Sequence, residues 1–380
     1  MITPSIALYT GASGGCDFYR SQQPFSILRK YRSQWKSNKF YRIYISGDIP
    51  QYNIFHTYRT HNPMMIKLFQ AANDAGKITI FDLDDDVFHM PSWNQASIEY
   101  RPGIVKVRLT PAAQAHYKAP YLEYDVLDNI HQLINMSTFV TASTPYLANE
   151  LIKHRDNLTA YVIPNCIDTD YLPTISPKKI PNTIKIGWAG GYNHDEDLKL
   201  ALPAVEQILH QYPNTTFTFI GADYRNLISN STLATNQVLH VKGSSSVHEY
   251  YQLLADEQID IGIIPVTDEL INLSKSPIKW MEYSIANIPT IASPVGPYAD
   301  NIQHQKTGWL VKKNRHTEWV KAIEYFINNP IETQVYASNA QEAVLNKYTM
   351  DHVANIFIPL TEKHASLLKE DKTYNKKVLF

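Results

Sequence analysis

The sequence has 380 residues, of which 44% are hydrophobic and 19% are charged, and its formal net charge at pH 7 is −1. These values are ordinary for folded domains and exclude a disordered, collagen-like or coiled-coil chain. The length predicts two domains. No apolar stretch approaches the ~20 residues of a membrane span. Residues 1–10 lack the basic and apolar regions of a secretory signal, so we expect a cytoplasmic protein.

The cysteines and the charges limit the class of protein further. Cys16 and Cys166 are the only cysteines, and neither has the spacing of a zinc site, so we expect no disulfide framework and no structural metal. Ten Lys and Arg residues and two Asp residues lie between Phe18 and Phe81, a local excess of ten minus two, or +8. This segment is either a solvated surface or a basic surface that faces a polyanion or an anionic membrane.

Short β-rich runs alternate with amphipathic segments of helix length, which predicts an α/β protein with helices on both faces of parallel sheets. In the first half, the expected strands are 5–10, 42–46, 54–57, 78–83, 138–141 and 161–164. The expected helices are 23–31, 63–75, 126–136 and 145–154. Residues 89–122 fit neither period and contain four prolines, so we expect a long loop or a lid there.

A second alternation follows residues 168–183, a stretch rich in Pro and Thr that predicts a domain boundary. The expected strands are 184–188, 216–220, 238–241, 259–264, 290–292 and 309–311. The expected helices are 196–211, 246–255, 277–286, 318–328, 332–346 and 351–369. We therefore expect a first domain at 1–172, a second at 173–346, and a C-terminal helix and tail at 347–380.

Glycine is scarce, and its positions suggest ligand-binding loops. Six of the 14 glycines follow or accompany the first strand of each half: Gly11, Gly14, Gly15, Gly187, Gly190 and Gly191. Loops at the carboxyl ends of parallel strands form the ligand crevice, and glycine there lets the backbone approach a phosphate or a sugar. Each cluster alone is equally compatible with a tight turn, but the matching positions favour two loops that face a ligand.

The stretch SKSPIKWMEY carries the strongest chemical signal. Ser276 as N-cap, followed by a proline, predicts a helix start with free amides at Ile278 and Lys279. The positive end of the helix dipole, together with Lys275 and Lys279, would form an anion site suited to a diphosphate. Glu282 lies on the same helical face, where it can accept hydrogen bonds from a ribose diol. The alternative is a capped surface helix with an ion pair between Lys279 and Glu282.

The continuation of this helix resembles a known family. EYSIANIPTIAS at 282–293 resembles the E-A-x-A-x-G-x-P-V-V-A-S signature of retaining GT-B glycosyltransferases (glycosyl transferases group 1, family 4-like). VGP at 295–297, DNI at 300–302 and KTGWLV at 306–311 resemble its G-x-x-E/D-x-I and T-G-x-L-V elements. VIPNCID at 162–168 resembles the segment that closes its first domain. The resemblance implies two Rossmann-like domains that face a central cleft, with the C-terminal helix crossing back to the first domain.

The resemblance also implies a donor site in the second domain, for a UDP- or GDP-sugar, and an acceptor side in the first. Glu282 would hold the ribose, while His194 is either a phosphate contact or an exposed loop histidine. The residues implied for the diphosphate and the transferred sugar are Lys275, Ser276, Ile278, Lys279, Gly14, Gly15, Gly190 and Gly191. The family neutralises the diphosphate without a metal, so no cofactor is expected.

The sequence departs from the family pattern at two places. Ser274 stands eight positions before Glu282, where the family often has a sugar-contacting Glu, which leaves Asp268, Glu269 and Asn272 as candidates. The arginine usual in the first loop of the second domain is also missing. Both departures concern how the donor is recognised.

The acidic run DLDDD at 82–86 has three interpretations. Clustered carboxylates after a strand can bind Mg²⁺ or Mn²⁺, can orient an acceptor hydroxyl or pair with Arg20 or Arg59, or can cap and solvate the surface. Asp84 and, just beyond the run, His89 are the candidate catalytic residues on the acceptor side, together with Gly15.

These observations predict an enzyme that transfers a hexosyl or pentosyl group to an acceptor hydroxyl with retention of configuration. We expect a saccharide or glycan-lipid acceptor, with peripheral membrane contact as one option. The alternatives are hydroxylated bases in DNA, which the basic stretch 101–118 and the aromatic Trp93 and Tyr100 would suit, and an epimerase of the same architecture.

Overall fold

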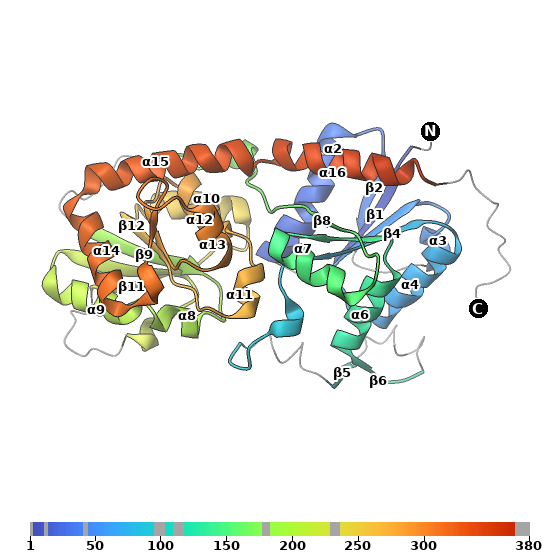
Figure 1. Ribbon diagram of the computed structural model, residues 1–380, viewed down its shortest axis with the longest axis horizontal. Coiled ribbons are helices and arrows are strands. Elements are labelled where there is room, and N and C mark those ends of the chain that lie inside the picture. Colours follow the sequence, from blue (N-terminus) through green and yellow to red (C-terminus); the bar gives the residue numbers. More distant parts are fainter. Residues whose placement is uncertain are drawn as a thin grey trace. The chain divides into compact units, whose positions relative to one another are not determined.

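The computed structural model describes residues 3–10, 14–40, 45–94, 103–108, 114, 118–176, 183–228 and 236–368. Gly11, Tyr100 and Arg101, which the sequence singled out, lie outside these ranges. The chain folds into two compact units (Figure 1). Unit 1 comprises Met1–Pro164 and Val353–Phe380, and unit 2 comprises Asn165–His352. None of the described helices has the length and apolar character that a membrane crossing requires.

Unit 1 is built on a parallel six-stranded sheet with the order β2-β1-β3-β4-β7-β8. Its strands are β1 (Ser5–Thr10), β2 (Lys36–Phe40), β3 (Ile54–Tyr58), β4 (Ile78–Leu83), β7 (Phe139–Ala142) and β8 (Ala160–Val162). Of the strand expected at 42–46, residues 42–44 lie outside the described residues, and the prediction is wrong at residues 45–46, where α3 (Ile45–Asp48) begins. β2 has the polar sequence KSNKF and partly exposed side chains at the sheet edge, so apolar patterning does not reveal it.

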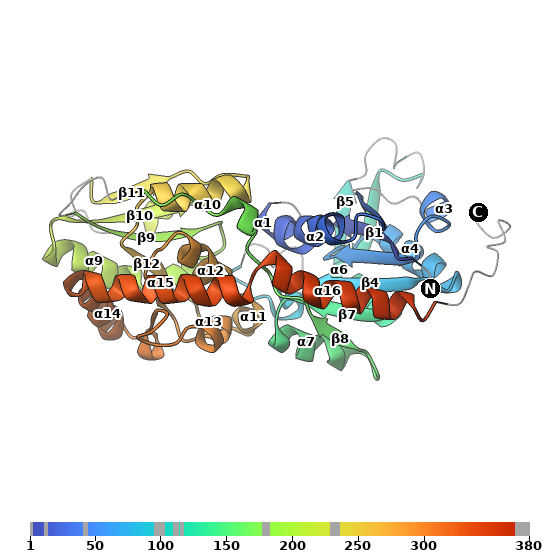
Figure 2. The same ribbon diagram turned by 90° about the horizontal axis from the view of Figure 1, so that it is seen from above.

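Helices cover both faces of this sheet. On one face, Phe55 and Val140 pack with α4 (Pro63–Asp74), α6 (Val126–Met136) and α7 (Pro145–Leu151). On the other face, α16 (Met350–Ala365) contacts the sheet through Phe357 against His56 and His364 against Phe139. α2 (Gln23–Tyr31) lies beside α16 (Figure 2), and Arg32 at its end pairs with Glu362 at 3.0 Å. The C-terminal helix therefore packs on the first unit.

The long loop expected at 89–122 contains regular structure. β5 (Ile104–Arg108) and β6 (Tyr121–Asp125) form an antiparallel pair, with Val105 opposite Tyr124. These two side chains pack against the core of unit 1 while their neighbours face outward. Five-residue strands between prolines give too short an alternation for a sequence pattern to detect. The prediction of a long loop or a lid was therefore wrong where these two strands lie.

Unit 2 repeats the architecture with a parallel sheet of order β11-β10-β9-β12-β13-β14. Its strands are β9 (Ile184–Gly190), β10 (Thr215–Gly221), β11 (Val238–Val241), β12 (Ile261–Ile264), β13 (Thr290–Ala292) and β14 (Trp309–Leu310). Its α-helices are α8 (Asp195–Lys199), α9 (Leu202–Gln211), α10 (Val247–Asp256), α11 (Leu270–Ser274), α12 (Ile278–Ile285), α13 (Gly296–Asn301), α14 (His316–Asn328) and α15 (Pro330–Lys347). The single helix expected at 196–211 is two helices, because Pro203 lies in the first turn of α9 and cannot donate to a preceding turn.

In each sheet the strands that follow the first strand are added on both of its sides, in opposite directions. In unit 1, β1 lies between β2 and β3, and in unit 2, β9 lies between β10 and β12. Ligands of open parallel sheets bind outside the carboxyl ends of the strands at such a switch point. Both glycine loops predicted from the sequence follow these first strands, so the topology itself places them at the two switch points.

Candidate functional site

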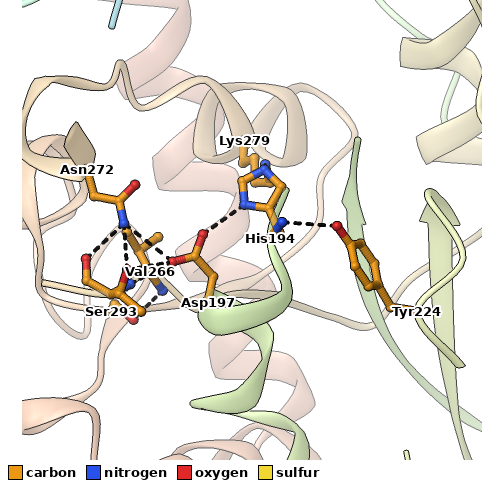
Figure 3. A network of polar contacts seen from close by, with 8 residues as sticks. His194, Asp197, Tyr224, Val266, Asn272, Lys279 and Ser293 are labelled. Carbon is orange, nitrogen blue, oxygen red and sulfur yellow. Dashed lines mark hydrogen bonds and ion pairs between the residues drawn. The ribbon is translucent and has the colours of Figure 1, made fainter. Parts of the chain in front are cut away.

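The switch point of unit 2 lies between the carboxyl ends of β9 and β12. β9 ends at Gly190, and the chain then passes through Gly191 and His194 into α8. The segment after β12 is fixed by Ser293, whose hydroxyl accepts from the amide of Val266 at 2.8 Å and donates to Asn314 at 2.6 Å. The two segments meet at Asp197 (Figure 3).

His194 joins these segments to α12. Its Nδ1 lies 2.8 Å from Oδ2 of Asp197, and its Nε2 lies 3.3 Å from Nζ of Lys279. Its backbone amide donates to the hydroxyl of Tyr224 at 3.0 Å. Burial, followed by the charge of Lys279, lowers the pKa of His194 to about 3. The imidazole is therefore neutral at physiological pH, and the side chain, only 18% exposed, is a fixed part of the site rather than a mobile surface histidine.

Lys279 lies beside an aromatic ring and a glycine. Its ammonium is 5.5 Å from the ring centroid of Trp188, a cation–π distance. A Cβ atom added to Gly190 would lie 2.8 Å from the Trp188 ring and 3.1 Å from Lys279 Nζ. Gly191 differs, because a Cβ there would meet nothing within 4 Å. Gly190 thus makes room for the cation, whereas Gly191 leaves open space beside it.

The start of α12 differs in detail from the sequence expectation. The N-cap is Pro277 and no side chain caps the helix, so the prediction of Ser276 as N-cap was wrong. Ser276 instead accepts a hydrogen bond at 2.9 Å from Asn165, at the beginning of unit 2. The amides of Ile278 and Lys279 still lie in the first turn, ahead of the first helical bond from Met281 to Pro277. The first-turn amides on which the predicted anion site depends are therefore present at this helix start.

Glu282 lies one turn further along α12 and is only 7% exposed. Burial raises the pKa of Tyr250 and Tyr298, and the charge of Glu282 raises it further. The carboxylate is therefore close to two phenol rings rather than on the solvent face of a surface helix. Lys275, in the linker before α12, contributes a second positive charge that acts on Asp197 and His194.

Of the residues around the Ser274 departure, Ser274 and Asn272 are buried, whereas Asp268 is exposed and Glu269 is partly exposed. Ser274 is fully buried and donates to the carbonyl of Ile271 at 2.6 Å. Asn272 is also fully buried and donates to Thr267 and to Asp197. The sequence analysis did not single out Asp197. An Asp three residues after His194 at the start of a helix was the signal that could have found it, because i and i+3 side chains share a face.

The switch point of unit 1 carries the other glycines. Gly14 has φ of +71°, a conformation that favours glycine, and Gly15 begins α1 (Gly15–Asp17). A Cβ at either residue would meet nothing within 4 Å. Cys16, which is exposed, follows, and the charge of Asp84 raises the pKa of its thiol to about 12. Gly15 and Asp84 therefore lie at the same edge of this sheet.

Basic side chains surround the acidic run, and Asp84 and Asp85 share one of them, Arg59. Asp82 forms a buried ion pair with Arg20, whose Nε donates at 2.9 Å. Asp85 pairs with Arg59 at 3.0 Å, and Asp86 lies 2.7 Å from Nδ1 of His89. The pairing with both arginines that the sequence suggested is present. Among the residues that the structure describes, no group of three His, Cys, Asp or Glu side chains is arranged to hold a metal ion.

Asp84 is the carboxylate of this run with the most perturbed environment. Tyr58 donates to its Oδ1 at 2.6 Å, and Arg59 lies 3.7 Å away. Burial, followed by the charge of Asp85, raises the pKa of Asp84 to about 6. His89 instead faces Asp86 and is 45% exposed. The two candidate catalytic side chains thus have different partners.

Much of the basic excess of unit 1 is neutralised by contacts that the sequence count could not show. Four of the ten basic residues pair with acidic residues outside the segment from Phe18 to Phe81. These pairs are Arg20 with Asp82, Arg32 with Glu362, Lys39 with Asp17, and Arg59 with Asp85. The segment is therefore less basic in the folded unit than in the sequence.

The two parallel-sheet units and the helix that returns to the first have the GT-B architecture. The sequence model of the family described as glycosyl transferases group 1 matches residues 176–343 of the chain, which lie in unit 2. The sequence-based predictions of the fold and of a glycosyltransferase are confirmed. No curated protein has a significantly similar sequence.

Solved structures with the same fold have low sequence identity to this chain. Anabaena HepE (Alr3699), in complex with UDP and glucose, has 15% identity and a TM-score of 0.65, with 95% of this chain and 99% of that chain covered. A glycosyltransferase from Rickettsia africae has 13% identity and a TM-score of 0.66, covering 97% and 100%. Sucrose-phosphate synthase from Thermosynechococcus elongatus has 14% identity and a TM-score of 0.64, covering 96% and 99%.

Proposed function

We propose that this glycosyltransferase takes its sugar from a nucleoside-diphosphate donor, with UDP favoured over GDP. The observation that carries the proposal is the ammonium of Lys279, held beside Gly190 at the switch point of the matched domain. The structure of HepE with UDP and glucose supports the choice of UDP. Lys279, Lys275 and the first amides of α12 would contact the diphosphate, and Glu282 would accept hydrogen bonds from the ribose.

The proposed transfer proceeds with retention of configuration through an oxocarbenium-like transition state. Negative charge develops on the departing diphosphate, and fixed cations and amides stabilise it without reorganising. Lys279 is suited to this task because its position is set by Trp188 and His194 before the donor arrives. We propose that the transfer needs no metal, since the cationic groups lie in the protein itself.

Unit 1 is the proposed acceptor side. Gly14 and Gly15 present an open backbone to the transferred sugar and phosphate, and Asp84 is the proposed contact for the acceptor hydroxyl. A carboxyl with a pKa near 6 can accept a hydrogen bond or a proton close to neutral pH. His89 is the second acceptor-side candidate, positioned by Asp86.

We propose a saccharide or a glycan-lipid as the acceptor. Pairing of Arg20, Arg32, Lys39 and Arg59 within unit 1 lowers the charge available for a polyanion, which argues against duplex DNA. A protein that grips DNA phosphates loses affinity with salt at a log–log slope of about −0.9 per phosphate contact. Binding of the true acceptor should therefore depend only weakly on salt.

The test is transfer from a panel of radiolabelled UDP- and GDP-sugars to saccharides, lipid-linked glycans and hydroxymethylated duplex DNA, with and without EDTA. The proposal expects label in a saccharide or glycan-lipid from a UDP-sugar, undiminished by EDTA, with the donor's anomeric configuration in the product. Label in DNA alone contradicts the proposed acceptor. An altered sugar that remains attached to the nucleotide would instead show an epimerase.

A further inference from the structure

The carboxylate of Asp197 divides its hydrogen bonds between its two oxygens (Figure 3). Oδ1 accepts from the amide of Thr267 at 2.8 Å, from the hydroxyl of Thr267 at 3.1 Å, and from Nδ2 of Asn272 at 3.4 Å. Oδ2 faces Nδ1 of His194 at 2.8 Å. The side chain is 1% exposed, so these protein donors replace water around it.

This arrangement fixes which nitrogen of His194 carries the proton. Burial acts to raise the pKa of Asp197, but the hydrogen bond from His194 and the charge of Lys275 outweigh it, and the pKa lies below the usual value. An ionised carboxylate can only accept, so the proton of the neutral imidazole lies on Nδ1. The lone pair on Nε2 therefore faces Lys279, which donates to it at 3.3 Å.

The neutral ring also keeps two opposite charges apart. If His194 were absent, the carboxylate of Asp197 and the ammonium of Lys279 would attract each other across the vacated space. A direct ion pair would neutralise Lys279 and hold it away from an incoming anion. The imidazole instead supplies a neutral acceptor, which orients the ammonium and leaves its charge in place.

We propose that Asp197 is a positioning residue for the donor's diphosphate. By selecting the tautomer of His194, Asp197 holds the Lys279 ammonium at the end of β9, between the Trp188 ring and Gly190. This inference rests on the proposed function, in which Lys279 contacts the diphosphate. Asp197 itself touches neither the nucleotide nor the sugar.

The isosteric variant Asp197→Asn separates this role from a structural one. The three donors from Thr267 and Asn272 retain an oxygen at the Oδ1 position. The new amide nitrogen then takes the place of Oδ2 and donates toward Nδ1 of His194. The ring proton moves to Nε2, where it faces the ammonium of Lys279. Two hydrogen-bond donors, Nε2 of His194 and the ammonium of Lys279, then face each other, and Lys279 moves away from its position beside Gly190.

Calorimetric titrations of UDP and of uridine into the wild-type protein, D197N, H194Q, K279M and D197N/K279M test the proposal. D197N should bind UDP at least tenfold more weakly and uridine within twofold of wild type, because uridine lacks the diphosphate. H194Q should weaken UDP binding less than D197N does, since an amide can donate to Asp197 and accept from Lys279. D197N should weaken UDP binding no further in the K279M background.

Two outcomes of the titrations overturn the inference: UDP affinity unchanged in D197N, and equal losses of UDP and uridine affinity, which show a general effect on the fold. The ¹⁵N spectrum of the histidine rings tests the tautomer in the wild-type protein even if D197N fails to fold. The signal that disappears in H194Q should report protonation at Nδ1, and protonation at Nε2 overturns the inference. Wild-type protein that binds neither UDP nor GDP contradicts the proposed function instead, and the tautomer measurement still decides the inference.

Discussion

A Cβ atom on Gly190 would lie 3.1 Å from the ammonium nitrogen of Lys279, so a missing side chain on β9 makes the place for a cation from α12. The same Cβ would lie 2.8 Å from the Trp188 ring, which is itself buried and cannot easily move. The glycine after the first strand therefore serves the ligand indirectly, by admitting a lysine. This relationship supplies the first test of the site.

Gly190→Ala should weaken UDP binding about tenfold or more, because the added methyl group displaces Lys279 or the Trp188 ring. Gly191→Ala is the matched control, since a Cβ there meets nothing within 4 Å. Calorimetric titration of both variants measures the difference. Equal affinities in the two variants would show that the place of Lys279 beside Gly190 does not matter for the ligand.

Glu282→Gln should weaken binding of uridine and UDP alike, because the ribose loses a charged acceptor. The loss of such hydrogen bonds costs roughly 1.5–3 kcal/mol, or about 10- to 150-fold in affinity. Glu249→Gln on the exposed side of α10 is the control. If Glu282→Gln weakens the binding of UDP but not of uridine, Glu282 acts on the diphosphate rather than on the ribose.

The strands and helices predicted from the sequence are correct where one element carries a regular pattern of apolar side chains. The apolar pattern locates β4 and α6 to the residue, because β4 is buried along its whole length and α6 buries one stripe in the core. It fails at the polar edge strand β2, at the hairpin of β5 and β6, and at the short helices α11 and α13, whose form depends on tertiary packing. Short or exposed elements are therefore the ones that the sequence pattern does not predict.

The residues of the candidate site likewise fall into those with a local sequence signal and those without one. Glu282, Lys279 and the glycines could be predicted because a helix start and a strand end have local signatures. The spacing of Asp197 from His194 is a local signal, but the role of Asp197 depends on Thr267 and Lys279, which lie 70 or more residues away in the chain. Ser276 was misassigned as N-cap because its partner is Asn165, which no local pattern reveals.

Asp84 predicts a pH dependence of stability. Its pKa is raised from 3.8 to about 6 in the folded protein, so the native state binds the proton more tightly than the unfolded state does. The resulting contribution to the unfolding free energy is fully present below about pH 4 and is lost as the pH rises through 6. Relative to Asp84→Asn, the wild type should lose up to about 3 kcal/mol over this interval.

Urea denaturation of the two proteins at several pH values between 4 and 7 measures this difference. Asp223→Asn serves as a contrast, because Arg225 lowers the pKa of Asp223 to about 2. The contribution of Asp223 is therefore present above about pH 4 and is lost as the pH falls toward 2. A wild type that gains stability relative to Asp84→Asn between pH 4 and 6 would be incompatible with a raised pKa.

The buried pair of Arg20 and Asp82 predicts strong non-additivity. Arg20→Leu should lower the unfolding free energy by about 3–5 kcal/mol, because it leaves a buried carboxylate without its charge partner. The double variant Arg20→Leu/Asp82→Leu should lose less than Arg20→Leu alone. Arg32→Ala, which breaks the half-exposed pair with Glu362, should cost no more than about 1 kcal/mol. If the double variant loses as much unfolding free energy as the two single variants together, Arg20 and Asp82 do not stabilise each other.

The most direct test of the central claim is the affinity of UDP for the wild-type protein and for Lys279→Met, measured by calorimetry with uridine as the reference ligand. Methionine keeps an unbranched apolar stem that is one atom shorter than lysine and removes the ammonium with its charge and its hydrogen bonds. The account predicts that UDP affinity falls about 10- to 150-fold while uridine affinity stays within twofold. Equal binding of UDP by the two proteins would contradict a diphosphate site at the end of β9.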